Sequence, residues 1–530
     1  MVSYAADTRN ICHVLKSRSD TSSHKQYVTA LCTNEKYIKR LEYYNLVGHA
    51  GCVNTVSWNS GGTLIVSGSD DQKLKIWEPF SKKLIRTIKT PHRGNIFCAK
   101  FMPGSNDQTI VSCAREPNIY VFDLSRPTNP LQQKYTCHSD VVHKLSIEPG
   151  STSVFISCSS DGTARQFDIR EKDINHIVAD LRRARSTVGS FRRPSCIPLN
   201  SVDFNPVNPN YFIIGGDDPY IRLYDRRSSS TICVQKYSPE SIVNNYNPDR
   251  PYSSCHITGV RHNVLGTEII GTWSGDNIYL FDVEPAKFAS PRVTSTPPPS
   301  SSSMDESADD DQEDDGEWED VPEEQQSNVS GESADYVSQY KVCCKGHVNV
   351  RTVKEVQFLG PRSEYIAAGS DCGNIFIYNS KNAEIVNVMK GDRDVVNCID
   401  PHPSCKLSFV SSGIDSDCKV WQPTLDEDKI KGPESWAHVL EENASEATDR
   451  NAFVLTPNML IQYLMNQEAG DSDQEGEVDD PQRDRRATLA RVARLLSQAN
   501  WNQEDEDEDE QVGEEDQEEE QEGRPQCRTM

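Results

Sequence analysis

The sequence lacks the short motifs that usually mark an enzyme. It contains no glycine-rich phosphate loop, no His-Glu-x-x-His zinc motif and no Gly-x-Ser-x-Gly nucleophile elbow. Five of its twelve histidines recur at one loop position of an internal repeat, where a structural role accounts for them. We therefore expect a protein that is not an enzyme and that holds no cofactor or metal. The opposite conclusion would need His, Asp or Glu side chains that converge in the folded chain.

Paired zinc ligands are also missing. The chain has 17 cysteines, but none is spaced as Cys-x-x-Cys. They are scattered singly apart from the adjacent Cys343 and Cys344, and most lie in strand-like runs. A cysteine in such a run acts as a small hydrophobic residue. This usage favours free thiols in a reducing compartment.

Long hydrophobic runs are absent as well. No apolar stretch approaches the roughly 20 residues of a membrane-spanning helix. The first residues, MVSYAADTRN, have neither a basic start nor an apolar centre, so we expect no signal peptide. The expectation is a soluble, intracellular protein without a membrane partner.

Basic residues are outnumbered, and the imbalance is local. Lys and Arg total 55 against 81 Asp and Glu, which gives a formal net charge of −26. Residues 288–338 carry fifteen acids and residues 501–530 carry fourteen, so the rest of the chain is nearly neutral. The arginine-rich run at 182–193 could bind phosphate groups, but a solvated basic loop is the favoured interpretation. Because the acidic segments would repel a phosphate backbone, nucleic acid is disfavoured as a partner.

An aromatic residue, often followed by Asp, recurs through the sequence. The recurring residues are Trp77, Phe122, Phe167, Tyr224, Phe281, Tyr378 and Trp421. Spacings of 43 to 45 residues match one four-stranded propeller blade. The longer spacings of 57, 57 and 97 residues each contain a polar or Pro/Ser-rich stretch, at 171–199, 236–254 and 286–338. The sequence therefore predicts an all-β propeller with insertions.

Within each period the local signals follow one order. A Gly-His-like pair is followed by an alternating strand, a strand of small residues, a turn with Asp and a last alternating strand. This arrangement resembles the WD40 repeat, in which the loop His, the turn Asp, a strand hydroxyl and the terminal Trp are joined by hydrogen bonds. The first repeat has all four, namely His49, Asp71, Ser67 and Trp77.

Other repeats depart from this set. The second has Glu116 at the turn position, and the sixth has Cys372 there. The seventh has Asp392 where the loop His is expected, and the fourth lacks the loop His. The third keeps its His and Asp but ends in Phe167. These departures weaken single blades, whereas closure of the ring would protect their edges.

The resemblance implies a seven-bladed WD40 propeller over residues 41–425. Residues 41–47 would form the outer strand of the last blade, because they have no other sheet to join. Residues 1–40 would form an N-terminal extension with a short helix that is capped by Asn34 and reaches Arg40. We expect a disordered acidic loop at 286–338 and an acidic disordered tail at 501–530. A C-terminal extension at 426–500 would contain short helices at 457–466 and 485–500.

Two stretches of sixteen residues match each other in neighbouring repeats. They are FISCSSDGTARQFDIR (155–170) and FIIGGDDPYIRLYDRR (212–227), and each ends in aromatic-Asp-x-Arg. The arginines, Arg170 and Arg227, would lie where the third strand turns toward the outer strand. A guanidinium fork there suits carboxylates or carbonyls of a partner. The alternative is that each arginine simply pairs with an acid of its own blade, such as Asp168.

These endings resemble the WDxR boxes of the DCAF family, the substrate receptors of cullin-4 RING ubiquitin ligases, with Phe and Tyr in place of Trp. Longer runs resemble the members related to the nuclear-receptor-interaction coregulator and its paralogues. These runs are 48–62, 92–107, 277–282, 369–379, 391–403 and 412–424. The likeness covers about residues 40–425.

The resemblance implies a non-catalytic substrate receptor that is nuclear and/or cytoplasmic. The ligase adaptor, a triple-propeller damaged-DNA-binding subunit, would dock on the two boxes, and the opposite face would hold an unknown protein substrate. The implied adaptor-binding residues are Phe167, Asp168, Arg170, Tyr224, Asp225 and Arg227. A general WD40 scaffold or transcriptional coregulator that binds proteins without a ligase remains the alternative.

Overall fold

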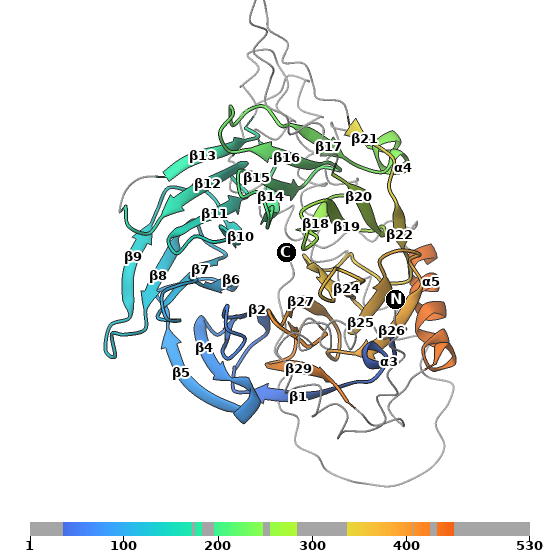
Figure 1. The fold of residues 1–530 in the computed structure, drawn as a ribbon, viewed down its shortest axis with the longest axis horizontal. Coiled ribbons are helices and arrows are strands. Elements are labelled where there is room, and N and C mark those ends of the chain that lie inside the picture. The colour runs from blue at the N-terminus through green and yellow to red at the C-terminus, as the bar shows by residue number, and fades with distance from the viewer. Residues whose placement is uncertain are drawn as a thin grey trace, which may run out of the picture. The chain divides into compact units, whose positions relative to one another are not determined.

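Seven antiparallel blades stand around a common centre in the computed structural model, which confirms the predicted seven-bladed propeller (Figure 1). The structure describes residues 35–171, 175–182, 196–246, 255–283, 336–405, 407–424 and 432–449. The chain divides into two compact units, residues 1–443 with 527–530, and residues 444–526. All the blades belong to the first unit, and the described part of the second is the end of one helix.

The blades follow one another along the chain. Blade 1 comprises β2 (Val53–Trp58), β3 (Ile65–Ser69), β4 (Lys73–Glu78) and β5 (Lys83–Lys89). Blade 2 comprises β6 (Ile96–Phe101), β7 (Thr109–Ala114), β8 (Ile119–Asp123) and β9 (Leu131–Tyr135). Blade 3 comprises β10 (Val142–Ile147), β11 (Val154–Ser159), β12 (Thr163–Asp168) and β13 (Asn175–Asp180).

The later blades repeat this order. Blade 4 comprises β14 (Leu199–Phe204), β15 (Tyr211–Gly216), β16 (Ile221–Asp225) and β17 (Gln235–Tyr237), and blade 5 comprises β18 (Ile257–His262), β19 (Glu268–Trp273), β20 (Ile278–Asp282) and β22 (Val342–Cys344). Blade 6 comprises β23 (Val356–Leu359), β24 (Tyr365–Gly369), β25 (Asn374–Asn379) and β26 (Ile385–Lys390). Blade 7 comprises β27 (Val396–Pro401), β28 (Phe409–Gly413), β29 (Asp417–Pro423) and β1 (Leu41–Val47).

The ring closes as predicted, through a strand from the beginning of the propeller. β1 pairs antiparallel with β29, from Leu41 opposite Pro423 to Val47 opposite Asp417. Blade 7 therefore draws its strands from both ends of the propeller sequence. Closure of this kind leaves no open inner edge for another chain to pair with.

The recurring aromatic residues form the core between the blades. All seven lie near the end of a third strand and are at most 2% exposed. Each packs with apolar residues of its own blade and of a neighbouring blade, as Phe167 does with Phe155 and Val121. The spacing of these residues therefore predicted the blades because burial requires one large side chain at the same place in every sheet.

The antiparallel order defines two faces of the ring. The first strands of adjacent blades contact one another and line the centre. The connections from first to second strand and from third to fourth strand emerge on one face, which we call the bottom face. The connections from second to third strand, and from one blade to the next, emerge on the opposite top face.

Three segments differ from the sequence predictions. Residues expected in the acidic loop form β21 (Tyr336–Val337), which pairs parallel with β17 because an apolar pair can extend the free edge of blade 4. The first helix, α3 (Glu35–Ile38), ends two residues before Arg40, because the chain turns there into β1. An unpredicted helix, α5 (Ala437–Asp449), follows Trp436, which is 4% exposed and packs on blades 5 and 6.

Three further short elements complete the described chain. The insertion after blade 4 begins with the short helix α4 (Glu240–Asn244), and single 3₁₀ turns occupy Pro79–Ser81 and Pro433–Ser435. No helix among the described residues is both long enough and apolar enough to cross a membrane. The predicted acidic tail, the helices at 457–466 and 485–500, Asn34 and most of the acidic loop lie outside the described residues.

Candidate docking surface

The predicted hydrogen-bonded set is complete in blade 1. His49 Nδ1 lies 3.0 Å from Asp71 Oδ2, His49 Nε2 lies 2.7 Å from Ser67 Oγ, and Trp77 Nε1 donates to that hydroxyl at 2.9 Å. Burial alone would raise the pKa of Asp71, but the His49 hydrogen bond and two backbone amides lower it to about 2. The set thus ties the loop before the blade to the turn within it.

Blades 2 and 3 keep this geometry with altered residues. In blade 2, His92 Nδ1 lies 2.5 Å from Glu116 Oε1, so the longer Glu side chain takes the place of Asp. In blade 3, His138 Nδ1 lies 2.8 Å from Asp161 Oδ2. In both blades the Nε2 atom of the histidine also lies within hydrogen-bond distance of a serine hydroxyl, as in blade 1. These histidines therefore have structural roles, as the repeat pattern predicted.

Blade 4 replaces its missing loop histidine by an arginine of its own third strand. Arg222 in β16 forms a two-pronged ion pair with Asp218, with Nη1 donating to Oδ1 at 2.8 Å. Both side chains are buried. Sequence reasoning missed this pair, because an arginine inside a strand gives no signal of which turn it will reach.

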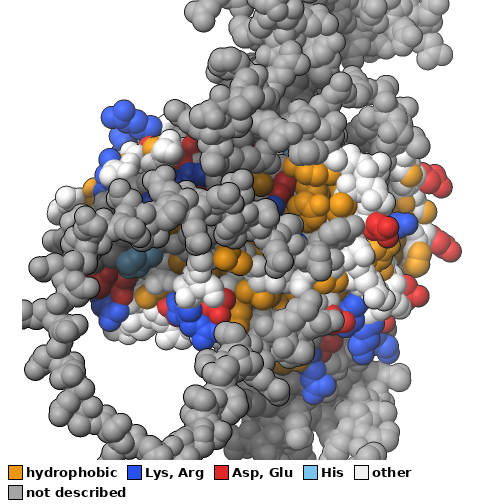
Figure 2. Space-filling view, turned by 90° about the horizontal axis from the view of Figure 1, so that it is seen from above, with side chains coloured by type: hydrophobic (Ala, Val, Ile, Leu, Met, Phe, Trp, Pro, Cys, Tyr) orange, Lys and Arg blue, Asp and Glu red, His pale blue; other side chains and the backbone are white. Residues whose placement is uncertain are grey.

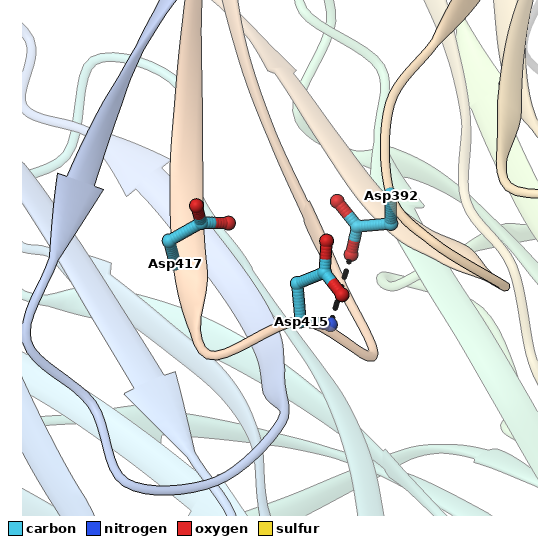
Figure 3. A group of neighbouring side chains, drawn as sticks. All are labelled: Asp392, Asp415 and Asp417. Atoms are coloured by element: carbon cyan, nitrogen blue, oxygen red, sulfur yellow. Dashed lines mark hydrogen bonds between the residues drawn. The ribbon is translucent and has the colours of Figure 1, made fainter. Parts of the chain in front are cut away.

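Blade 7 replaces the histidine by a carboxylate and adds a lysine that balances it. Asp392, Asp415 and Asp417 face a common point, an arrangement that could hold a metal ion (Figure 3). However, Lys419 Nζ lies 2.8, 3.2 and 2.7 Å from oxygens of these residues, so an ammonium group already takes the place of a cation. Burial raises the pKa of Asp392 to about 6 despite this neighbour. We assign the cluster to the structure of the blade.

Charged side chains also meet in the central channel, which the sequence did not reveal. The cations are Lys100, Lys144 and Arg261, and the carboxylates are Asp203, Glu355 and Asp400. Arg261 lies 3.3 Å from Asp203 and 3.2 Å from Glu355, and Lys144 of blade 3 pairs with Glu355 beside blade 6. Each carboxylate thus has a cation at hand, and the network joins blades that are not neighbours.

The first predicted arginine lies in a tight turn on the bottom face. Asp168 ends β12, and its Oδ1 accepts a hydrogen bond from the backbone nitrogen of Arg170 at 3.0 Å. The same carboxylate accepts hydrogen bonds from Arg170 Nε at 2.9 Å and from Nη2 at 2.5 Å. The Arg170 side chain is 74% exposed. Its Nη1 has no hydrogen-bond partner among the described residues.

Blade 4 repeats this geometry one blade further on. Asp225 Oδ1 accepts hydrogen bonds from the backbone nitrogen and Nε of Arg227 at 3.0 and 2.9 Å, and Oδ2 accepts one from Nη2 at 2.7 Å. The Arg227 side chain is 58% exposed, and its guanidinium carbon lies 5.8 Å from the ring centre of Tyr211. In both turns the hydrogen bond from the arginine is the main cause that lowers the pKa of the Asp carboxyl.

Each arginine therefore pairs with the acid of its own blade, which was the alternative interpretation. The pairing uses one edge of the guanidinium and leaves most of the side chain exposed. It also restricts the rotamers of Arg170 and Arg227, so less entropy is lost when a partner binds. Own-blade pairing and docking are thus compatible.

Phe167 and Tyr224 have a different role from the one that their place in the boxes suggests. Both rings are 1% exposed and pack in the core of their blades. They cannot form a contact surface in this conformation. Their contribution is to anchor the strand ends from which Asp168 and Asp225 project.

Arg226, which sequence reasoning did not single out, links blade 4 to blade 3. Its Nη2 donates to Glu148 Oε1 of blade 3 at 2.5 Å, and its Nη1 lies 3.4 Å from Gln166 Oε1 in β12. The side chain is only 20% exposed. A residue adjacent to Arg227 thus fixes blade 4 against blade 3, and no periodic pattern in the sequence indicated that it would turn inward.

The chain contains close counterparts of these turns elsewhere. On the bottom face, Asp123 of blade 2 pairs with the 53% exposed Arg126, three residues along. At the end of outer strand β13, Asp180 binds Arg182 with Nε and Nη2 contacts of 2.9 and 2.5 Å, as in the Arg170 turn. Because β13 ends beside the start of β12, Arg182 lies at the top face. Arg182 therefore repeats the ion-pair geometry of Arg170 on the opposite face of the ring.

The side chains on the propeller edge are mixed in kind. Figure 2 views the face above β16 and β17 of Figure 1, and the visible described residues show hydrophobic side chains in the middle, with basic and acidic groups around them. Among the visible described side chains, groups of both signs occur.

Comparison with known proteins agrees with this architecture. The WD40 family, described as "WD domain, G-beta repeat", matches residues 41–78, 129–168 and 383–422. The human "DDB1- and CUL4-associated factor 6" is 35% identical over 260 residues, which are 47% of this chain and 29% of that protein. "Protein ALTERED SEED GERMINATION 2" of Arabidopsis thaliana is 33% identical over 52% of this chain and 40% of its own length.

A third relative extends the comparison to fission yeast. "WD repeat protein iqw1" of Schizosaccharomyces pombe is 34% identical over 46% of this chain and 32% of that protein. The matched region thus spans less than half of the length of each of these relatives. The WD40 repeats and the homology to DDB1- and CUL4-associated factor 6 support a member of the WD40 DCAF family.

Proposed function

We propose that the protein is a non-catalytic substrate receptor of a cullin-4 RING ubiquitin ligase. In this proposal the bottom face binds the DDB1 adaptor through Arg170 and Arg227, and the top face and channel mouth hold a protein substrate. The observation that carries it is the pair of exposed arginines, each held by an Asp in the same turn of adjacent blades. The name of the human relative associates that protein with DDB1 and CUL4.

A receptor role fits the chemistry of the described residues. The channel carboxylates are paired with cations. Burial alone would raise the pKa of the Asp203 carboxyl, but the neighbouring Arg261 and His262 lower it below its ordinary value. His262 Nε2 has no hydrogen-bond partner within the described part of the chain, but its side chain is fully buried and closed to a substrate. Ubiquitination would then be promoted by raising the local concentration of a substrate near the ligase. We place this activity in the nucleus and/or cytoplasm.

The test is a double substitution, R170A with R227A, in the full chain. We expect the affinity for purified DDB1 to fall at least about tenfold, because charge-assisted contacts in an interface are lost. The melting temperature should stay close to wild type, since exposed ion pairs contribute little to stability. R182A is the matched control, because it removes the same kind of pair from the top face.

A second arm separates orientation from charge. D168N with D225N keeps both arginines but weakens the ion pairs that orient them. We expect a several-fold loss of DDB1 affinity, smaller than for the arginine double variant. Undiminished DDB1 binding by R170A/R227A would contradict the proposal. Capture of chromatin factors without cullin or DDB1 would instead favour a general scaffold.

A further inference from the structure

An exposed apolar patch lies beside the arginine turns on the bottom face. It consists of Val207, Val264 and Leu265, which are 66%, 40% and 61% exposed. Val207 lies in the connection from β14 to β15, and the other two lie in the equivalent connection of blade 5. Large apolar side chains that gather on a surface often mark an interaction site.

The loops that carry the patch are held together by hydrogen bonds. Asn205 Nδ2 donates to the carbonyl of Gly266 at 2.9 Å, and Asn205 Oδ1 accepts from the backbone nitrogen of Val207 at 3.0 Å. On the other side, the backbone nitrogen of Val264 donates to Ser363 Oγ of blade 6 at 3.0 Å. The patch is therefore anchored across three blades and presents a fixed surface.

The same loop connects the patch to Arg227. Tyr211, which closes the Val207 loop through hydrogen bonds with Asn205 and Asn208, lies under the Arg227 guanidinium at 5.8 Å. The backbone nitrogen of Arg226 also donates to the carbonyl of Asn210 at 2.9 Å. The arginine turn of blade 4 and the apolar patch thus form one continuous piece of surface.

A docking surface made of two arginines alone would be too small. A stable interface of standard size buries roughly 800 Å² on each partner. Such interfaces combine an apolar centre with a polar rim, in which arginine is enriched. The patch supplies the apolar centre, and Arg170 and Arg227 supply part of the rim.

We propose that Val207, Val264 and Leu265 form the apolar centre of the surface that binds DDB1. This inference rests on the proposed function and extends it from two residues to a surface across blades 3 to 5. The partner surface would present apolar side chains flanked by carboxylates or carbonyls, which match the arginines in charge. The patch belongs to the same interface as Arg227 because the loop that carries Val207 leads into Tyr211, which lies under the Arg227 guanidinium.

The experiment measures binding of purified DDB1 to the full chain carrying V207D and L265D. We expect at least about a tenfold loss of affinity, as for central apolar contacts in interfaces. V350D is the matched control, because Val350 is 44% exposed in a loop on the top face. V207S with L265S removes the apolar groups without adding negative charge near Arg227. Both double variants should keep a wild-type melting temperature, since the side chains are exposed.

The outcomes distinguish this inference from the proposed function. Loss of binding in R170A/R227A with wild-type binding in both patch variants would overturn the inference and leave the proposed function in place. Wild-type binding in R170A/R227A would overturn the proposed function itself. Concentration-dependent self-association that is lost in V207D/L265D, with DDB1 affinity unchanged, would show that the patch binds a second copy and would also overturn the inference.

Discussion

Arg226 of blade 4 and Glu148 of blade 3 form an ion pair between adjacent blades, with 2.5 Å between Nη2 and Oε1. Arg226 belongs to the turn that carries Arg227, and Glu148 lies in the connection from β10 to β11. Both side chains are largely buried, at 20% and 12% exposure. The guanidinium also lies over the Phe204 ring, 5.9 Å from its centre. Arg226 therefore ties the blade that carries Arg227 to the blade that carries Arg170.

Removal of this link should affect both stability and binding. We expect R226M to lower the free energy of unfolding by about 1–3 kcal/mol, because it leaves the largely buried Glu148 without its partner. E148Q should have a similar effect. In a double-mutant cycle measured by urea denaturation, the double variant should lose less free energy of unfolding than the two single variants together. DDB1 affinity should fall several-fold in each. R126M, which removes an exposed pair on the same face, is the control; equal losses in R126M would contradict a specific role for Arg226.

Acid should unfold the propeller partly through the carboxylates of the histidine sets. The folded-state pKa of Asp71 is about 2, whereas an unfolded Asp titrates near pH ~3.9. A lowered folded pKa contributes stability that is present above the unfolded pKa and is lost as the pH falls toward 2. D71N should therefore be less stable than wild type at pH 7, and the difference should shrink on going to pH 3. Urea denaturation at the two pH values measures this, with the exposed Asp394→Asn as control. A difference that does not depend on pH would contradict it.

The recurring features of the fold were predictable because each blade solves the same packing problem. One buried aromatic residue per sheet gave the number of blades, and the spacing of Trp77 and Phe122 already equals one blade. The leftover segment Leu41–Val47 was assigned to blade 7 because no other sheet needed it. The arginine turns were predictable for a related reason, since Asp-x-Arg is local and its geometry is determined by a hydrogen bond two residues away.

The features that sequence reasoning missed depend on partners that are distant in the chain. Lys144 and Glu355 meet across the channel, and Arg226 meets Glu148 in another blade. Nothing in the local pattern indicates such pairs, because the period of a strand tells which face a side chain takes but not which charge it will find. Helix α5 was missed for a similar reason. Its position depends on the burial of Trp436, Val439 and Leu440 against blades 5 and 6.

Lys419 is the counter-charge for three carboxylates, and its loss should be costly. K419M should lower the free energy of unfolding at pH 7.5 by about 3–5 kcal/mol, because it leaves Asp392 and its neighbours buried without a cation. The folded pKa of Asp392 is already raised to about 6, so its contribution to stability is greatest at low pH and declines as the pH rises through 6. Without the lysine this pKa should rise further, and K419M should regain stability between pH 7.5 and 5.5 more than wild type does. Urea denaturation at both pH values tests this, with the exposed Lys89→Met as control. If K419M unfolded like that control, the cluster would not depend on its lysine.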